Sequence, residues 1–220
     1  MEINEAYAIM STRTGGMYLD DDSRCYIFTD RKQAEEWSKK IKNTMVSQPR
    51  YFKIREMGQE CYAYGADVIV LCTRSEEKQF PLGPNSSDRE YDNHTLDRLL
   101  VRIRQTRRKK LLSLFADERF LIPVQIKDRD GYPEIQYGCA VRKDGKLMYV
   151  AFSNLQEFTA WSSRVQGWRV VETGYRELWQ IARNHGVMIN PFGNRFILKR
   201  SMMEDVPPKE RTEADDHSEN

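Results

Sequence analysis

The chain has 220 residues, of which 40% are hydrophobic and 11% aromatic, enough to bury one large core or two smaller ones. No apolar run approaches the roughly 20 residues of a membrane-spanning helix, and the first ten residues, MEINEAYAIM, lack the layout of a signal peptide. These features exclude a helical membrane protein, and we expect a globular protein of the cytoplasm.

The formal net charge of +2 is unevenly distributed along the chain. Residues 204–220 carry seven acidic side chains against Lys209 and Arg211, a balance of −5, so the rest of the chain carries +7. This segment has no large apolar residue after Val206, so burial cannot offset the entropy of ordering it. We predict that residues 203–220 form a disordered acidic tail.

The cysteines show no CxxC spacing and lie in stretches that resemble strands. In a cytoplasmic protein this pattern favours buried free thiols over disulfides or a metal site. The residues concerned are Cys25, Cys61, Cys72 and Cys139.

The first half of the chain, residues 1–74, reads as strands around one helix. A strand in AYAIMS is followed by a TGG turn, a further strand in MYLDDDSRCYIF and a helix that starts after Asp30. Strands are then predicted in YFKIREM and CYAYGADVIVLCTR, and a second helix is not evident.

Two segments of the chain resemble each other at a constant offset of 124 residues. FTDRKQAEEWSKK, which starts at Phe28, aligns with FSNLQEFTAWSSR, which starts at Phe152, and Trp37 then aligns with Trp161. Each copy follows an apolar stretch and marks the passage from a strand to a helix. The repeat predicts an internal duplication, with both tryptophans packed on a sheet.

Both copies have the sequence of a helix N-cap. Asp30 with Gln33, and Asn154 with Glu157, fit a reciprocal capping box, in which the cap side chain accepts from an early backbone N–H and the later side chain reaches back.

The middle of the chain changes composition twice. Residues 75–93 are rich in Pro, Gly, Ser and charge, which predicts a linker. Residues 94–117 have an apolar stripe interrupted around Arg107, which predicts a basic amphipathic connecting helix. Seven basic residues and no acidic ones lie between positions 98 and 110: Arg98, Arg102, Arg104, Arg107, Arg108, Lys109 and Lys110.

This basic run admits three interpretations. In the first, the apolar stripe packs on its own domain and leaves a solvated basic face. In the second, the basic side chains bind an acidic surface, either a partner protein or the acidic tail of the chain. The third interpretation is a nucleic acid or an anionic membrane surface, although no known nucleic-acid module accompanies the run.

The second half contains more regular structure. A strand is predicted in FLIPVQI, a loop in KDRDGYPE, and a hairpin in YGCAVRKDGKLMYVAF because Asp144-Gly145 suits a tight turn. A helix after Asn154, a strand in WRVVE and a helix from about Gly174 to Gly186 follow, and strands VMIN and RFIL end the region.

Taken together, the elements predict an α+β protein. We expect two related α/β halves, each a mixed or antiparallel sheet with packed helices, joined by the basic helix.

Four blocks in the second half resemble the N-terminal domain of the SseB family, bacterial proteins named for enhanced serine sensitivity. They are LIPV (121–124), AFSNLQEFTAW (151–161), WRVVE (168–172) and GVMINPFGNRFIL (186–198). The resemblance implies a compact α/β domain at residues 118–202. The chain departs from the family pattern in that a degenerate copy is predicted before it, at residues 1–74. It brings no catalytic motif, and nothing in the chain resembles the C-terminal domain of that family.

The turn INPFGNRF is the sharpest candidate site. Asn190 precedes a proline and is expected to be extended, Pro191 fixes φ, and Gly193 can adopt a positive φ, so these three residues have a conformational explanation. Phe192 has none, and it either plugs the end of the sheet or protrudes as an aromatic anchor for a partner. Both interpretations stay open from sequence alone.

Catalytic and metal-binding motifs are not evident. Cys139 and His185 could form a nucleophile pair only if the fold brings them together. The acidic run at residues 20–22 does not have the spacing of an EF-hand loop, which favours a solvated turn. Phosphate-binding glycine motifs are missing as well. We therefore predict no enzymatic activity, no cofactor and no metal.

The leading hypothesis is a non-catalytic protein-interaction or scaffold module. Binding of nucleic acid or an anionic surface through residues 98–110 is the alternative.

Overall fold

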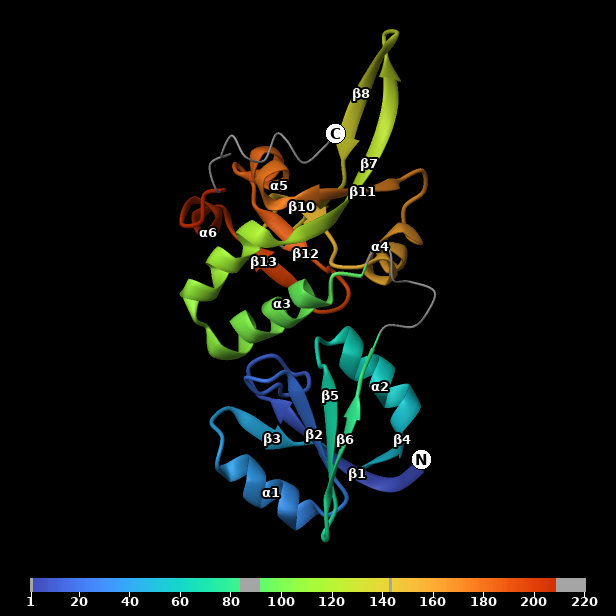
Figure 1. The fold of residues 1–220 in the computed structure, drawn as a ribbon. Helices are drawn as coiled ribbons and strands as arrows, with labels where there is room; N and C mark the ends of the chain where they lie inside the picture. The colour runs from blue at the N-terminus through green and yellow to red at the C-terminus, as the bar shows by residue number, and fades with distance from the viewer. Residues whose placement is uncertain (1, 84–91, 143, 209–220) are drawn as a thin grey trace, which may run out of the picture. The chain divides into compact units, whose positions relative to one another are not determined.

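The computed structural model describes residues 2–83, 92–142 and 144–208 (Figure 1). The chain forms two compact units. Unit 1 comprises Met1–Leu111 with Ser153–Gln156, and unit 2 comprises Leu112–Phe152 with Glu157–Asn220. The mixture of helices and mixed sheets confirms the predicted α+β class.

Unit 1 is built on a mixed sheet with the strand order β3-β1-β2-β5-β6, and β4 also pairs with β1. β2 and β5 are parallel, whereas β1 pairs antiparallel with β2 and β6 with β5. The strands are β1 (Glu2–Ser11), β2 (Arg24–Phe28), β3 (Thr44–Val46), β4 (Arg50–Lys53), β5 (Val68–Cys72) and β6 (Glu77–Pro81).

Helices pack on both faces of this sheet. They are α1 (Arg31–Lys39), α2 (Ile54–Ala63) and α3 (His94–Thr106). Because side chains alternate along a strand, Cys25 and Ile27 of β2 join one core and Phe28 joins the other. α2 and α3 contribute to the first core, and α1 contributes to the second.

The start of α1 confirms one half of the predicted capping box. Asp30 Oδ1 accepts a hydrogen bond of 3.0 Å from the Gln33 backbone N–H, as an N-cap should. The reciprocal half is wrong, because Gln33 Oε1 is buried and has no hydrogen-bond partner among the described residues. Asp30 Oδ2 accepts instead from the Arg74 guanidinium.

Two expectations for the first half are wrong. The predicted strand YFKIREM ends at Lys53, and its remainder begins α2, the second helix that the sequence did not reveal. Ile54, Met57 and Cys61 have helical spacing and pack in the core, but Gly58 interrupts the stripe.

The predicted linker, residues 75–93, contains β6, which pairs along the whole of β5. β6 is an exposed edge strand, so it lacks the apolar alternation that predicts strands. Residues 84–91 lie outside the described residues.

The predicted connecting helix at 94–117 is interrupted at Arg107 as expected. α3 ends at Thr106, Arg107 has a φ of 57°, and a 3₁₀ helix, η2 (Lys109–Asp117), follows. The apolar stripe of α3 is buried, including Leu96, Leu100 and Val101 at 0% exposure.

Unit 2 contains two sheets, with strand orders β13-β12-β10-β9 and β11-β7-β8, and an isolated bridge joins Leu121 to Phe152. β10 and β12 are parallel, whereas β9 pairs antiparallel with β10 and β13 with β12. The strands are β7 (Arg119–Arg129), β8 (Tyr132–Tyr137), β9 (Cys139–Val141), β10 (Leu147–Ala151), β11 (Arg169–Gly174), β12 (Val187–Ile189) and β13 (Phe196–Leu198).

Aromatic residues form much of the core of unit 2. The Phe115 and Phe120 rings lie 6.2 Å apart, and Tyr175 packs against both. Elsewhere the Trp161 ring lies 5.8 Å from that of Phe152. The helices are α4 (Leu155–Ser162), α5 (Tyr175–Ala182) and α6 (Arg200–Glu204).

Several expectations for the second half are confirmed. Asp144-Gly145 joins β9 to β10 with a Gly145 φ of 78°, and Gly186 follows α5 with a φ of 86°. The predicted loop KDRDGYPE is wrong. β7 continues through it to Arg129, and β8 returns after a turn at Asp130-Gly131.

The predicted disordered tail, residues 203–220, is wrong at its start. Met203 in α6 is completely buried, and its backbone oxygen accepts from Trp179 Nε1 at 3.0 Å. Tyr175 Oη donates to the Val206 backbone oxygen at 2.9 Å. These contacts give residues 203–206 a place in unit 2, and residues 209–220 lie outside the described residues.

No helix of the described residues is long and apolar enough to cross a membrane. The cysteines are free thiols, as predicted, although Cys61 lies in α2 and not in a strand.

Candidate functional site

The loop between β12 and β13, residues 190–195, is the first candidate site, and it lies within unit 2. Asn190 leaves β12 with a φ of 48°, is completely buried, and donates its N–H to the Ala151 oxygen at 3.0 Å. Asn194, at the other end, is 7% exposed. Two buried asparagines therefore fix both ends of the loop.

Glu157 in the first turn of α4 holds the centre of the loop. Its carboxylate accepts hydrogen bonds from the backbone N–H groups of Gly193 and Asn194. Burial raises the pKa of Glu157, and these two hydrogen bonds partly oppose that effect. A Cβ at Gly193 would lie 1.6 Å from Glu157 Oε1, so this position requires glycine.

Phe192 protrudes from this fixed loop. Its side chain is 47% exposed, and the Arg164 guanidinium lies 3.9 Å from the centre of its ring. A cation over a ring restricts the ring without covering its other face. The loop thus presents an aromatic side chain and a guanidinium next to each other.

The conformational reasoning for this turn was wrong at two of its residues. Asn190 is left-handed and not extended, because asparagine tolerates a positive φ. The φ of Gly193 is not positive. The residue has to be glycine because its missing side chain lets the Glu157 carboxylate approach the loop backbone. Pro191 is partly buried, and Phe192 protrudes rather than plugging the sheet.

The predicted basic surface divides into two parts. Arg102 pairs with Asp21 at 3.1 Å, and Arg104 donates to the Thr14 backbone oxygen at 3.2 Å. From the left-handed Arg107 onward the basic side chains are exposed, namely those of Arg107, Arg108, Lys109 and Lys110. The structure therefore uses the helical part of the run for packing within unit 1.

A hollow of about 250 Å³ in unit 1 adjoins this surface. Basic side chains of Arg13, Lys42, Arg102 and Arg108 line it, together with Asp20 and Asp21.

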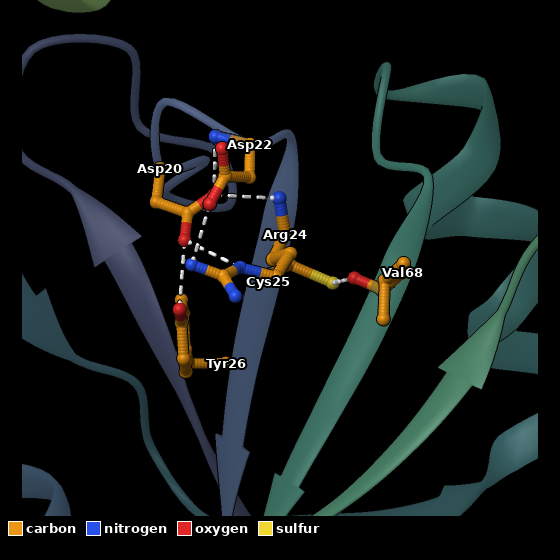
Figure 2. A network of polar contacts seen from close by, with 6 residues as sticks. All are labelled: Asp20, Asp22, Arg24, Cys25, Tyr26 and Val68. Carbon is orange, nitrogen blue, oxygen red and sulfur yellow. Dashed lines mark hydrogen bonds and ion pairs between the residues drawn. The ribbon is translucent and has the colours of Figure 1, made fainter.

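The negative charge of Asp20 at this hollow is already paired within the turn, as Figure 2 shows. Its carboxylate accepts from Arg24 Nε at 2.8 Å, from Tyr26 Oη at 2.7 Å and from the backbone N–H groups of Asp22 and Arg24. Burial alone would raise the pKa of Asp20, but these hydrogen bonds lower it below its ordinary value. The predicted acidic run is thus an ion-paired turn, and it leaves the basic side chains dominant in the hollow.

Cys139 and His185 each neighbour Tyr149. Cys139 is the register partner of Tyr149, and the His185 ring lies 5.8 Å from the Tyr149 ring. However, the Cys139 thiol bonds to the Tyr137 backbone oxygen at 3.4 Å, and burial raises its pKa. A nucleophilic cysteine needs the opposite shift.

The sequence predicted a helix from residue 94, but it did not reveal a polar cluster around His94 at the start of α3. His94 Nε2 lies 3.0 Å from Asp67 Oδ1, Arg98 reaches the same oxygen at 2.8 Å, and the Tyr62 ring stacks on His94 at 3.9 Å. Burial lowers the pKa of His94, although Asp67 opposes the shift. The Asn93 cap, which accepts from the Leu96 N–H, was the available signal for a helix start here.

The fold and these features define a small α+β protein whose most distinct surface feature is a rigid aromatic loop. A family model described as the SseB protein N-terminal domain matches residues 96–205, half of the chain. The chain belongs to the SseB family. No curated protein and no solved structure matches it significantly.

Proposed function

We propose that this SseB-family protein is a non-catalytic interaction module that binds a partner protein through residues 190–194. The observation that carries the proposal is the half-exposed Phe192 on a loop whose backbone is already fixed. Aromatic side chains that need little ordering on binding are common interface hot spots.

The loop also suggests the chemistry of the partner. Phe192 requires an apolar pocket, and Arg164 at its side would pair with a carboxylate at the rim of that pocket. The raised pKa of Cys139 supports a role without nucleophilic catalysis. A cytoplasmic location is part of the same proposal.

Quantitative affinity purification from the native host tests this function. Wild-type protein and Phe192→Ala are compared, with Val141→Ala as a control for an exposed apolar residue at 68% exposure. We expect Phe192→Ala to bind a purified partner at least about 30-fold more weakly, and Val141→Ala to bind normally. Equal retention of every partner by Phe192→Ala would contradict the proposal.

A second candidate function is binding of nucleic acid or an anionic surface by unit 1. It is favoured by the hollow lined with Arg13, Lys42, Arg102 and Arg108, and by the exposed basic residues next to it. Fluorescence anisotropy with labelled DNA and RNA should then show affinity that falls steeply with salt and is weakened by Arg108→Ala. The outcome against it is a lack of binding at low salt.

A further inference from the structure

The β7–β8 hairpin in unit 2 has a part that no other strand supports. β11 pairs with β7 only at Arg119–Val124, whereas β8 pairs with Val124–Arg129. The outer part, residues 125–136, is therefore a two-stranded arm, and it extends away from the helices of unit 2 (Figure 1). β8 is an edge strand of its sheet, so one side of its backbone can pair with another strand.

The turn of the arm fixes which backbone groups face outward. Asp130 and Gly131 both have positive φ values, 58° and 84°, as in a two-residue type I′ turn. Tyr132 is paired with Arg129 by two backbone hydrogen bonds next to the turn. From there, every second residue of β8 directs its backbone N–H and oxygen toward β7. The Gly138 N–H donates to the Pro123 oxygen at 2.9 Å, which agrees with this alternation. Pro133, Ile135 and Tyr137 therefore direct their backbone groups outward.

One face of the arm carries an exposed apolar pair at its centre. Ile126 and Ile135 are direct cross-strand partners, yet they are 62% and 57% exposed. Val124, Tyr137, Pro133 and, next to the turn, Asp128 lie on the same face, because paired residues share a face and side chains alternate along each strand. Two large β-branched side chains left exposed beside an open edge are a surface suited to pairing.

We propose that two copies of this chain associate through antiparallel pairing of β8 with β8, with Ile135 at the twofold axis. In this register Ile135 lies opposite Ile135 of the second copy, Glu134 opposite Gln136, and Pro133 opposite Tyr137. The isoleucine pairs of both copies then form one continuous apolar row.

The neighbouring registers fit less well. A shift of the axis by one residue toward the turn places Glu134 opposite Glu134, which puts like charges face to face. The opposite shift places Pro133 beyond the end of β8 in the second copy. In the proposed register the charged face is also compatible, because Lys127 lies across from Glu134 within each hairpin.

The backbone groups also match in this register. The two Ile135 residues exchange N–H to oxygen bonds, and the Tyr137 N–H donates to the Pro133 oxygen of the second copy. Pro133 has no N–H to return, but the Tyr137 oxygen already accepts from the Cys139 thiol at 3.4 Å. Since Pro133 has no N–H, the outward N–H groups of β8 are those of Ile135 and Tyr137, and both are paired in this register. The contact is small, so we expect a weak dimer with a dissociation constant on the order of 100 µM.

Disulfide trapping tests the register in a Cys139→Ser background, since the remaining cysteines are buried. Ile135→Cys should form a disulfide dimer in a glutathione buffer, because directly opposed residues are about 5.5 Å apart between Cα atoms. Ile126→Cys is the matched control, with the same face and similar exposure but one strand further from the axis. Glu134→Cys and Gln136→Cys should not dimerise alone, and they should form a disulfide when mixed.

The proposal is overturned if Ile135→Cys yields no more disulfide dimer than Ile126→Cys at the same concentration. Sedimentation of the unmodified chain provides a second measurement. Wild-type protein should self-associate at high concentration, Ile135→Lys should stay monomeric with an unchanged circular dichroism spectrum, and Ile135→Val should behave as the wild type. A monomeric wild type at the highest concentration would also refute it, and none of these results depends on Phe192.

Discussion

The two units arrange their central strands in the same order. In unit 1 the order is β1-β2-β5-β6, and in unit 2 it is β9-β10-β12-β13; in each, two parallel central strands have an antiparallel strand on either side. Two helices occur between the parallel strands in each case, α1 and α2 or α4 and α5. This agreement supports the predicted internal duplication, which stays a prediction.

The units differ in the connection that follows the second parallel strand. In unit 1 it is the short turn 73–76, where Arg74 pairs with Asp30 at the start of α1 at 2.6 Å. In unit 2 it is the longer loop 190–195, where Glu157 in the first turn of α4 binds the loop backbone. The connection contacts the start of a helix in both units, but only in unit 2 is it long enough to present an aromatic side chain. The difference indicates that the candidate binding loop is an elaboration of a structural turn.

The tryptophans provide the largest expected effect and the most direct test of the comparison. Trp37 lies 6.0 Å from Phe28, and Trp161 lies 5.8 Å from Phe152, so each ring packs on the phenylalanine where a strand gives way to a helix. Trp161 is 8% exposed, and Trp161→Ala should cost about 3–5 kcal/mol of unfolding free energy. Trp37 is more exposed, and Trp37→Ala should cost about 2–3 kcal/mol. Urea unfolding followed by circular dichroism measures both, and an unchanged stability of Trp37→Ala would argue against equivalent roles.

The two passages from a strand to a helix could be predicted from sequence because they rest on local chemistry. Asp30, Trp37 and Trp161 act within a few residues of a strand end, so their spacing is visible in the chain. The loop geometry could not be predicted, because Gly193 is required by Glu157, a residue on another element. The hairpin arm was missed for a different reason. Its strands are charged and exposed, and only Asp130-Gly131, the same dipeptide type as Asp144-Gly145, signalled the turn.

Gly193→Ala should have the next largest effect, and it tests how unit 2 holds its loop. The added Cβ would displace the Glu157 carboxylate and break its hydrogen bonds to the loop, at a cost of about 1–3 kcal/mol. The double variant with Glu157→Ala should lose less than the sum of the single changes, because both remove the same contact. Additive losses in urea unfolding would show that the contact does not hold the loop.

Asp30→Ala tests the corresponding contact in unit 1. There the Arg74 side chain binds the carboxylate at the start of the helix, whereas in unit 2 the loop backbone binds it. Loss of an N-cap should cost about 0.5–2 kcal/mol. Arg74→Ala should cost less than about 1 kcal/mol, because the Arg74 side chain is 85% exposed and its ion pair is screened by solvent. Because Asp30→Ala removes both contacts, equal losses in Asp30→Ala and Arg74→Ala would show that the ion pair, and not the cap, is the main contact.

The smallest expected effects are changes in stability with pH, and they should have opposite signs in the two units. In unit 1 burial lowers the pKa of His94, even though Asp67 and Asp92 favour its charged form; Arg98 adds to the lowering. Unfolding therefore takes up a proton as the pH falls below about 6.5, the ordinary value, and unit 1 loses stability in that range. In unit 2 burial raises the pKa of Glu157, so folding favours its protonated form. The stability of unit 2 therefore rises as the pH falls toward the ordinary pKa of glutamate.

Fluorescence can separate these two slopes because Trp37 is the tryptophan of unit 1, whereas Trp161, Trp168 and Trp179 belong to unit 2. Unfolding of unit 1 is followed through Trp37 in a variant with the other three changed to Phe, and unit 2 is followed in Trp37→Phe. His94→Gln should flatten the slope of unit 1 below the ordinary pKa of histidine without changing that of unit 2. Glu157→Gln should flatten the slope of unit 2 above the ordinary pKa of glutamate without changing that of unit 1. Glutamine keeps each position polar but does not titrate. If the dependence of the unfolding free energy on pH is unchanged in both variants, it comes from other groups and not from the burial of His94 and Glu157.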